Sequence, residues 1–358
     1  MSVRLHPLWV IVIAGVALTA GLLGGYELRG SSSSPGAPSA NSGSPVLSIT
    51  GAGTLGTAFP ALASLLVNQS TGAQAPSASQ TYQGSLAALG LIATSHDVYD
   101  VAAAADFRLI PHLLEPTYAN WEVVFATNPE VLVYDPSVAA LSGINSSNWG
   151  EKVQSAGVVL GVANATTDPN GYNGIFVLQL EGLAEGGSLA SLYSHFYTGA
   201  PGSPALPVSS TAKLELETQV STLISTHVVS AFITYRSYAV THHLSYVSLD
   251  PSVGLGNFSS EELANYALAS TQITAANGSL TTIRGAPVAF SATVPLNAAN
   301  LTLGDLFVHL VLSSQGEAFL QSYGFTPILP GYSIGSKALP GLLQPETVAL
   351  PAALAAEI

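Results

Sequence analysis

Cysteine is absent from this chain, and charged side chains are scarce in it. Without cysteine there are no disulfides, no thiolate metal sites, no catalytic thiol and no lipid-modified N-terminal cysteine. Charged residues make up 8% of the 358 residues, with eight Lys and Arg against 21 Asp and Glu. Because nucleic acids are bound by clustered positive charge, this composition excludes a nucleic-acid partner.

Sequence signatures of common enzymes are missing as well. The eight histidines are scattered, and the chain contains no His-Glu-x-x-His, no Gly-x-Ser-x-Gly and no Walker loop. We therefore predict that the protein is not an enzyme, with an exported hydrolase built on unrecognised residues as a distant alternative. An acidic protein can still bind a small anion, through backbone N–H groups and hydroxyls instead of cations.

The shortage of Lys and Arg has two explanations. In an acidic medium carboxylates lose their charge, and excess cations would then repel one another. Compositional drift accounts for the shortage equally well, so the composition leaves the working pH of the protein open.

The N-terminal segment has the composition of a membrane anchor. Residues 8–25 are uncharged and follow Arg4, and their number is close to the roughly 20 residues that a membrane helix needs. Residues 26–45 form a linker, in which Ser, Gly, Pro and Ala dominate from residue 31 onward. We expect residues 1–25 to be either a cleaved signal or a retained anchor on the outer face of the cell membrane, and the linker favours the anchor. No other segment stays apolar long enough to cross a bilayer.

Six Asn-x-Ser/Thr sequons are scattered over the remaining chain. They lie at Asn68, Asn145, Asn164, Asn257, Asn277 and Asn300. One sequon arises easily by chance in a chain rich in Ser and Thr, but six predict a glycoprotein in which at least some are modified. Glycosylation agrees with an extracytoplasmic location.

From residue 46 onward, short β-rich runs alternate with longer helical stretches. Strands are expected at residues 46–49, 97–105, 120–134, 158–162, 228–234 and 288–294. Helices are expected at residues 59–67, 174–184, 217–225, 261–269 and 303–323, the last with Thr302 as its N-cap. This alternation predicts an α/β fold with mostly parallel sheets.

Four segments carry a more specific pattern. The first is Gly51-Ala-Gly-Thr-Leu55 followed by Phe59-Pro60, and the second runs from Val101 to Pro111 and on into residues 118–128. The third is Asp168-Pro-Asn-Gly-Tyr172 with residues 179–182, and the fourth joins Tyr235-Arg-Ser237 to residues 293–297 and Gly316-Glu317. In this order and spacing, the chain resembles the archaeal tungstate/molybdate-binding proteins of ABC transporters over residues 47–345.

The resemblance implies a two-lobe, periplasmic-binding-protein-like (type II) fold with the ligand cleft between the lobes. Lobe I then comprises residues 46–126 plus 293–345, lobe II comprises residues 127–292, and residues 346–358 form a C-terminal tail. The implied partners are the permease and ATPase subunits of an ABC importer, and we expect a monomer. A cleft between lobes agrees with the rule that ligands of α/β sheets bind outside the carboxyl ends of the strands.

Two turns are expected to present hydrogen-bond donors to the ligand. Gly53-Thr54 and Gly84-Ser85 match the two Gly-Ser pairs of the resembling family. A strand-to-helix turn offers free backbone N–H groups and a positive helix end to an anion, and the hydroxyls of Thr54 and Ser85 add one donor each. Each hydroxyl could instead be a simple N-cap, or serve both purposes.

The other candidate residues come from three later segments. Asp168-Pro169-Asn170 matches a family Asp-Pro-Cys, in which the backbone N–H of the third residue is an expected contact. Glu217 matches a family Glu, and Tyr235, eighteen positions later, matches a Tyr whose hydroxyl contacts the oxyanion. On residue type alone, Asp-Pro-Asn-Gly is a turn signal and Glu217 is a favourable first-turn carboxylate.

Two carboxylates facing an anion are unfavourable, because like charges about 4 Å apart cost on the order of 4 kcal/mol at an effective dielectric constant of about 20. Either the carboxyls of Asp168 and Glu217 are protonated and donate hydrogen bonds, or they coordinate the metal centre and expand its four oxygens to six ligands. The resemblance implies coordination, which sulfate and phosphate do not allow. We therefore predict tungstate or molybdate as the ligand and no cofactor. The alternatives are another oxyanion such as sulfate, or a surface module without a role in transport.

Overall fold

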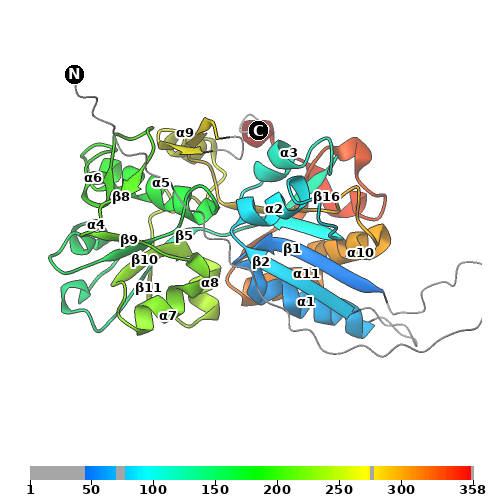
Figure 1. Ribbon diagram of the computed structural model, residues 1–358, viewed down its shortest axis with the longest axis horizontal. Helices are drawn as coiled ribbons and strands as arrows, with labels where there is room; N and C mark the ends of the chain where they lie inside the picture. The colour runs from blue at the N-terminus through cyan, green and yellow to red at the C-terminus, as the bar shows by residue number, and fades with distance from the viewer. Residues whose placement is uncertain (1–44, 70–76, 275–277, 356–358) are drawn as a thin grey trace, which may run out of the picture. The chain divides into compact units, whose positions relative to one another are not determined.

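The computed structural model describes residues 45–69, 77–274 and 278–355 (Figure 1). The expected anchor at residues 8–25, residues 26–44 of the expected linker and the sequon at Asn277 lie outside the described residues. Within these ranges, no helix combines the length and the apolar composition that crossing a membrane requires.

The larger of the two main sheets has seven strands in the order β16-β15-β4-β14-β3-β1-β2. They are β1 (Val46–Ala52), β2 (Ser77–Gln83), β3 (Val101–Ala104), β4 (Glu122–Thr127), β14 (Ala289–Thr293), β15 (Thr326–Ile334) and β16 (Thr347–Ala349). β1 pairs in parallel with β2 and β3, and Ala52 at the end of β1 lies opposite Gln83 at the end of β2. The turns that follow these two strands therefore start from the same edge of the sheet.

The second main sheet has five strands in the order β11-β5-β10-β6-β9. They are β5 (Glu130–Tyr134), β6 (Leu160–Val162), β9 (Ala212–Leu214), β10 (Ala231–Tyr235) and β11 (Tyr246–Ser248). β10 is parallel to β6 and antiparallel to β5. Two strand pairs stand apart from the main sheets, β7 (Tyr197–Thr198) with β8 (Leu206–Pro207), and β12 (Ser270–Thr274) with β13 (Leu280–Arg284).

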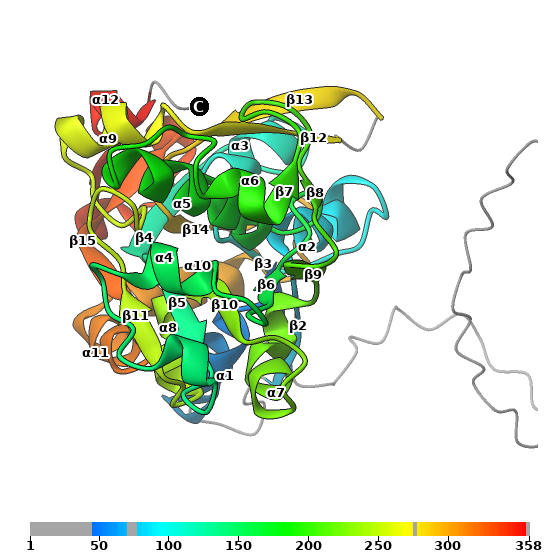
Figure 2. The same cartoon turned by 90° about the vertical axis from the view of Figure 1, so that its left-hand side faces the viewer.

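Helices cover both main sheets. The seven-stranded sheet is accompanied by α1 (Leu55–Gln69), α2 (Ser85–Ala93), α3 (Leu109–Leu113), α10 (Leu301–Leu312), α11 (Ser314–Ser322) and α12 (Ala352–Ala355). The five-stranded sheet is accompanied by α4 (Trp149–Val153), α5 (Pro169–Ala184), α6 (Tyr193–Phe196), α7 (Val220–Ser225), α8 (Arg236–Thr241) and α9 (Ser260–Tyr266). Figure 2 shows α5 on one face of this sheet and α7 and α8 on the other. The alternation along β5 agrees, because Leu132 packs in the cluster that contains α5 whereas Val131 and Val133 pack with residues of α7 and α8.

The expectation of mostly parallel sheets was wrong, because both main sheets are mixed. β14 runs antiparallel to both of its neighbours, β3 and β4. The chain leaves the seven-stranded sheet at the end of β4 and returns to it at the start of β14, where Asn128 N–H donates to the carbonyl oxygen of Val288 at 3.2 Å. A strand that enters the sheet where its neighbour leaves must run in the opposite direction.

Two expected elements each proved to be a pair. The strand expected at residues 120–134 is β4 and β5, which belong to different sheets and are separated at Asn128-Pro129. Proline has no N–H to donate to a strand ladder, so it suits the point where the chain changes sheets. The helix expected at residues 303–323 is α10 and α11, which meet at Ser313, and the N-cap of α10 is Asn300 instead of Thr302.

Aromatic packing joins the two sheets where the chain crosses between them. Phe290 of β14 contacts Tyr235 at the end of β10 edge-on, with ring centroids 5.5 Å apart, and packs against Phe125 and Phe325 as well. All four side chains are buried. The tyrosine expected to contact the ligand is therefore held from behind by the core of the other sheet.

Candidate functional site

The turn between β1 and α1 places Gly53 and Thr54 at the carboxyl edge of the seven-stranded sheet. The Thr54 side chain is buried at 3% exposure, and its hydroxyl has no hydrogen-bond partner among the described residues. Thr54 is therefore not an N-cap through its side chain. A buried hydroxyl without a partner is costly, which is the state expected of a donor that a ligand completes.

The turn between β2 and α2 presents Ser85 from the neighbouring strand. The N-cap of α2 is Gly84, so Ser85 is not a side-chain cap either. The buried Ser85 hydroxyl accepts a hydrogen bond from the N–H of Ala105 at 2.9 Å, which fixes its oxygen and leaves its own proton to donate. The first-turn N–H groups of α1 and α2 lack partners within their helices, as at every helix start.

Asp168, Pro169 and Asn170 form the start of α5. Asp168 is the N-cap, Pro169 is in the first turn, and the Asp168 carboxylate accepts the backbone N–H of Asn170 at 3.0 Å. The N–H group that was expected to contact the ligand thus has a partner within the protein. The Asn170 side chain donates through Nδ2 to Glu130 Oε2 at 3.1 Å, and its Oδ1 has no partner among the described residues.

Glu217 and Tyr235 both belong to the part of the chain that forms the five-stranded sheet. Glu217 follows β9 by three residues, and Tyr235 is the last residue of β10. The helix expected at residues 217–225 is a 3-10 turn (Glu217–Gln219) followed by α7. Glu217 is 3% exposed, and its Oε1 accepts the hydroxyl of Thr234 at 3.0 Å. Thr234 precedes Tyr235 in β10, and the buried Tyr235 hydroxyl has no partner among the described residues.

The two glycines show how closely these segments approach one another. A Cβ atom on Gly53 would lie 2.7 Å from Thr218 Cγ2 and 3.4 Å from Glu217 Oε2. A Cβ atom on Gly84 would lie 2.3 Å from the carbonyl oxygen of Thr167 and 3.0 Å from Asp168 Cβ. A side chain at Gly84 would collide with backbone of the acidic segment, and one at Gly53 would force the Thr218 side chain to move. The structure therefore brings the turns at residues 53–54 and 84–85 against the acidic segments at 168 and 217.

Burial controls the charge of the acidic residues. Loss of solvent raises the pKa of Asp168 to about 6, and loss of solvent together with the charge of Asp168 raises the pKa of Glu217 to about 8. Glu130, buried at the start of β5, has its pKa raised well above its ordinary value by burial and by the charges of Glu217 and Asp168. The ion pairs among the described residues, Arg108 with Asp106 and His227 with Asp135, do not involve these three carboxyls.

Residues that the sequence did not indicate also shape this region. Glu130 supports Asn170, Thr234 supports Glu217, and the hydroxyl of Tyr172 in α5 donates to Asp106 Oδ2 at 2.7 Å. The Asp106–Tyr172 bond ties the start of α5 to the end of β3. Of Glu130, Thr234 and Tyr172, Glu130 is the one that the sequence could have indicated, because a carboxyl at the start of an otherwise apolar strand is rarely buried without a reason.

The arrangement suits a small anion better than a resident metal ion. Hydroxyls and helix-start N–H groups come from one side, and carboxyls whose pKa values are raised by burial come from the other. Over the part of the chain that the structure describes, no group of three or more His, Cys, Asp or Glu side chains could hold a metal ion. Glu130 therefore does not complete a cation site with Asp168 and Glu217.

Known proteins share both the sequence pattern and the fold. Residues 47–326 match the family of bacterial extracellular solute-binding proteins. The chain is 31% identical to the solute-binding protein MMP1652 of Methanococcus maripaludis, over 81% of this chain and 89% of the relative. It is also 27% identical to the molybdate/tungstate-binding protein WtpA of Thermococcus kodakarensis, over 67% of this chain and 70% of the relative.

Solved structures with similar folds include two from bacteria. The periplasmic molybdate-binding protein of Azotobacter vinelandii aligns with a TM-score of 0.52 at 13% identity, over 78% of this chain and 98% of that one. The sulfate-binding protein SubI of Mycobacterium tuberculosis aligns with a TM-score of 0.52 at 12% identity, over 87% of this chain and 96% of that one. At these identities the similarity concerns the fold alone.

Proposed function

The chain belongs to the family of bacterial extracellular solute-binding proteins, and we propose that it captures tungstate or molybdate for an ABC importer. Its two-lobe, periplasmic-binding-protein-like α/β fold confirms the predicted fold class. We call the lobe built on the seven-stranded sheet the first lobe and the lobe built on the five-stranded sheet the second lobe. The family comprises solute-binding transport proteins and not enzymes.

The observation that carries the proposal is the pairing of donors with carboxyls across the contact between the lobes. Thr54 and Ser85, with the first-turn N–H groups behind them, lie on the first-lobe side, and Asp168 and Glu217 lie on the second-lobe side. A tetrahedral oxyanion accepts hydrogen bonds from the donors. The carboxyls then act on its centre, which in tungstate and molybdate accepts two further ligands. Sulfate has no such capacity.

Protonation leaves two roles for Glu217 in this proposal. With a pKa of about 8, Glu217 is mostly neutral at pH 7 and can donate a hydrogen bond to an oxo oxygen. Coordination of the metal centre instead requires that the Glu217 proton moves to an oxo oxygen or to solvent. We favour coordination, because the spacing of eighteen residues to Tyr235 puts Glu217 where the resembling family has its ligating Glu. The WtpA relative from Thermococcus kodakarensis, a molybdate/tungstate-binding protein by name, supports the same ligand class.

Isothermal titration calorimetry with tungstate, molybdate and sulfate tests the ligand class. We expect tungstate and molybdate to bind far more tightly than sulfate. Equal or preferred binding of sulfate would remove the tungsten and molybdenum proposal and leave a generic anion binder.

We further propose that the protein works outside the cytoplasm with permease and ATPase subunits, held at the membrane by residues 8–25. The support is the family and the composition of the N-terminal segment. A neighbouring gene pair encoding a permease and an ATPase would support the partnership. Stimulation of that ATPase by the tungstate-loaded protein would test it, and no stimulation would contradict it.

A further inference from the structure

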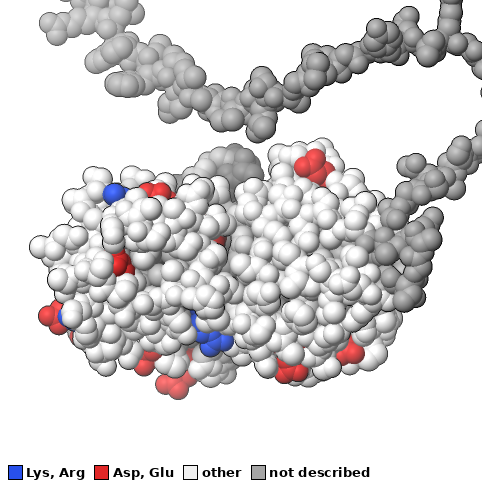
Figure 3. Space-filling view, turned by 90° about the horizontal axis from the view of Figure 1, so that it is seen from below, with Lys and Arg blue, Asp and Glu red and all other residues white. Residues whose placement is uncertain are grey.

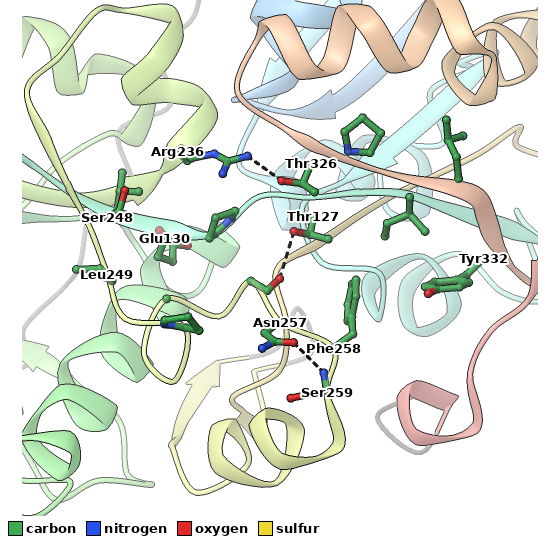
Figure 4. A pocket seen from close by; sticks show the side chains of 18 residues that line it. Thr127, Glu130, Arg236, Ser248, Leu249, Asn257, Phe258, Ser259, Thr326 and Tyr332 are labelled. Carbon is green, nitrogen blue, oxygen red and sulfur yellow. Dashed lines mark hydrogen bonds between the residues drawn. The ribbon is translucent and has the colours of Figure 1, made fainter. Parts of the chain in front are cut away.

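A cavity separate from the proposed oxyanion site lies where β15 of the first lobe faces the loop between β11 and α9 of the second (Figure 4). Its volume is about 720 Å³, within the range of roughly 300–1,000 Å³ that is typical of small-molecule sites. None of the eight residues proposed for the oxyanion site lines it. A single tetrahedral oxyanion is far too small to fill this space, so a larger molecule must be considered.

The walls of the cavity are largely apolar. The apolar residues that line it include Phe258, Ile328, Leu329 and Tyr332. The rings of Phe258 and Tyr332 meet edge-on with centroids 6.2 Å apart, and Leu329 is 39% exposed. Walls of this kind favour the hydrocarbon or aromatic body of an organic molecule.

Arg236 provides a positive charge at one end of the cavity. Its guanidinium donates through Nε to the carbonyl oxygen of Gly324 at 2.8 Å and through Nη2 to the hydroxyl of Thr326 at 2.7 Å. Both acceptors are neutral, and neither ion pair among the described residues includes Arg236. Figure 4 shows Arg236 reaching toward Thr326 at one end, with Phe258 and Tyr332 toward the other.

The charge of Arg236 is uncommon in this protein and is not cancelled within the cavity. The chain has eight Lys and Arg in 358 residues, and Figure 3 shows a face on which charged side chains are few and scattered. Glu130 is the one carboxyl among the residues that line the cavity, and burial together with the charges of Glu217 and Asp168 raises its pKa well above its ordinary value. A fixed guanidinium with neutral partners matches a carboxylate, which it can bind through two N–H groups.

We propose that this cavity binds a small organic carboxylate, with its carboxylate on Arg236 and its apolar body against Phe258, Ile328 and Tyr332. The proposal goes beyond the oxyanion function and does not depend on it. Hydroxyls of Thr127, Ser248 and Ser259 lie on the same lining and can orient polar substituents of the ligand.

Calorimetry of the full chain with three probes tests the proposal. The probes are sodium hexanoate, phenylacetate and 4-phenylbutyrate, each compared with its neutral amide. We expect saturable binding of at least one carboxylate at one site per chain, with the amide at least about tenfold weaker, since a charged hydrogen bond is lost. Saturating tungstate should not compete. Failure of all three carboxylates to bind, or equal binding of acid and amide, would overturn the proposal.

Two variants assign the binding to this cavity. Arg236→Gln should lower carboxylate affinity at least about tenfold and bring it close to that of the amide, whereas Arg284→Gln, the same change at an exposed arginine outside the cavity, should leave it unchanged. Leu329→Trp places a larger side chain in the exposed wall of the cavity and reduces its volume. It should lower the affinity for the carboxylate and the affinity for its amide by similar factors. If circular dichroism shows that Arg236→Gln does not fold, the Leu329→Trp variant alone tests whether the carboxylate binds in this cavity. Carboxylate binding that is unaffected by the folded variants would contradict the assignment.

Discussion

The two faces of the proposed oxyanion site differ in kind. The first lobe contributes Thr54, Ser85 and the N–H groups of two helix starts, without a carboxyl. The second lobe contributes Asp168, Glu217 and, behind them, Glu130. The second lobe adds the Tyr235 hydroxyl as a donor, but the hydroxyls of Thr54 and Ser85 come from the first lobe and both carboxyls from the second, so neither lobe alone offers the complete set of proposed partners to an oxyanion. The proposed site therefore requires the close approach that Gly53 and Gly84 permit.

If the protein binds an oxyanion as proposed, the difference between the two faces also explains how an acidic protein accommodates an anion. The acids are gathered on one side, where burial raises the pKa values of all three and repulsion by neighbouring carboxylates adds to those of Glu217 and Glu130, while the hydroxyl and N–H donors of the first lobe are uncharged. The attraction for the anion then comes from oriented hydrogen bonds instead of net positive charge. Changes on the two faces should accordingly have different consequences.

The largest expected effect is on the acidic face. If Glu217 coordinates the metal centre, Glu217→Gln should weaken tungstate by about a hundredfold, roughly 3 kcal/mol, because an amide is a poor replacement for a carboxylate ligand. Calorimetry at pH 5 and pH 7 measures the change. If tungstate affinity is nearly unchanged in Glu217→Gln, Glu217 does not coordinate the metal centre. It then acts as a neutral hydrogen-bond donor, a role that an amide preserves.

The pH dependence of the unmodified protein gives a second test of the same residue. A donating Glu217 requires its proton, so tungstate affinity should fall as pH rises through about 8. A coordinating Glu217 has no such need, although formation of a six-coordinate oxyanion can itself consume protons. The variant is therefore the more discriminating measurement of the two.

The next largest effect should come from the contact between the faces. Gly84→Ala places a Cβ atom 2.3 Å from the carbonyl oxygen of Thr167, so the lobes must separate there. We expect tungstate affinity to fall between about tenfold and a hundredfold, about 1.4–2.8 kcal/mol. Gly90→Ala in the same helix is the control, because nothing lies within 4 Å of an added Cβ there. That change should leave binding intact and favour the helix by about 0.5–1 kcal/mol. Similar affinities for the two variants would show that the close approach is not needed.

A smaller effect is expected on the donor face. Thr54→Ala and Ser85→Ala each remove one donor to a charged ligand, worth roughly 1.5–3 kcal/mol, so tungstate affinity should fall about tenfold or more in calorimetry. The two should differ in stability toward urea. Ser85→Ala also leaves the N–H of Ala105 without its acceptor, whereas the Thr54 hydroxyl has no partner among the residues that the structure describes. Intact binding in both folded variants would mean that these hydroxyls do not contact the ligand.

The smallest effect concerns a carboxyl of the first lobe that lies away from the site. Glu122 is fully buried in β4, with Ser291 as its neighbouring hydroxyl, and burial raises its pKa well above 4.5. The folded state therefore holds the Glu122 proton more tightly, and the free energy of unfolding should be highest below about pH 4.5 and fall as pH rises above it. In Glu122→Gln the difference in stability between pH 4 and pH 8 should narrow by at least about 1.4 kcal/mol, the equivalent of one pKa unit.

Urea unfolding at the two pH values measures this difference, with Glu261→Gln as the exposed control. Asp106, Asp135 and Asp250 act in the opposite direction. Arg108 lowers the pKa of Asp106 below 3.8, and hydrogen bonds, chiefly from Ser137 and Ser252, do the same for Asp135 and Asp250, so the contribution of all three is lost as pH falls further. Maximal stability is expected near pH 4, and a maximum at pH 7 or above would contradict the assignment of Glu122 as a buried neutral acid.

Much of the local structure could be predicted from the sequence. The apolar runs of β1, β3, β10 and β14 and the turn glycines at 53 and 84 are visible as patterns, and strands end in turns near the expected positions. The predictions of element boundaries failed where one apolar sequence pattern runs through two elements that pair with different neighbours. The apolar run through residues 120–134 reads as one strand because both β4 and β5 are buried, although they lie in different sheets.

What the sequence by itself determined is therefore the set of local elements and the chemistry available at their ends: hydroxyls and glycines after β1 and β2, and carboxyls at residues 168 and 217. Only the tertiary structure decided which of these ends meet, that Glu130 supports Asn170 from a strand forty positions earlier, and that residues 248–259 and 326–332 enclose a common cavity. It also decided the charge of the acids. Hydrophobic pattern and turn propensity act over a few neighbouring residues, whereas desolvation and the distance between two carboxyls depend on what packs around them.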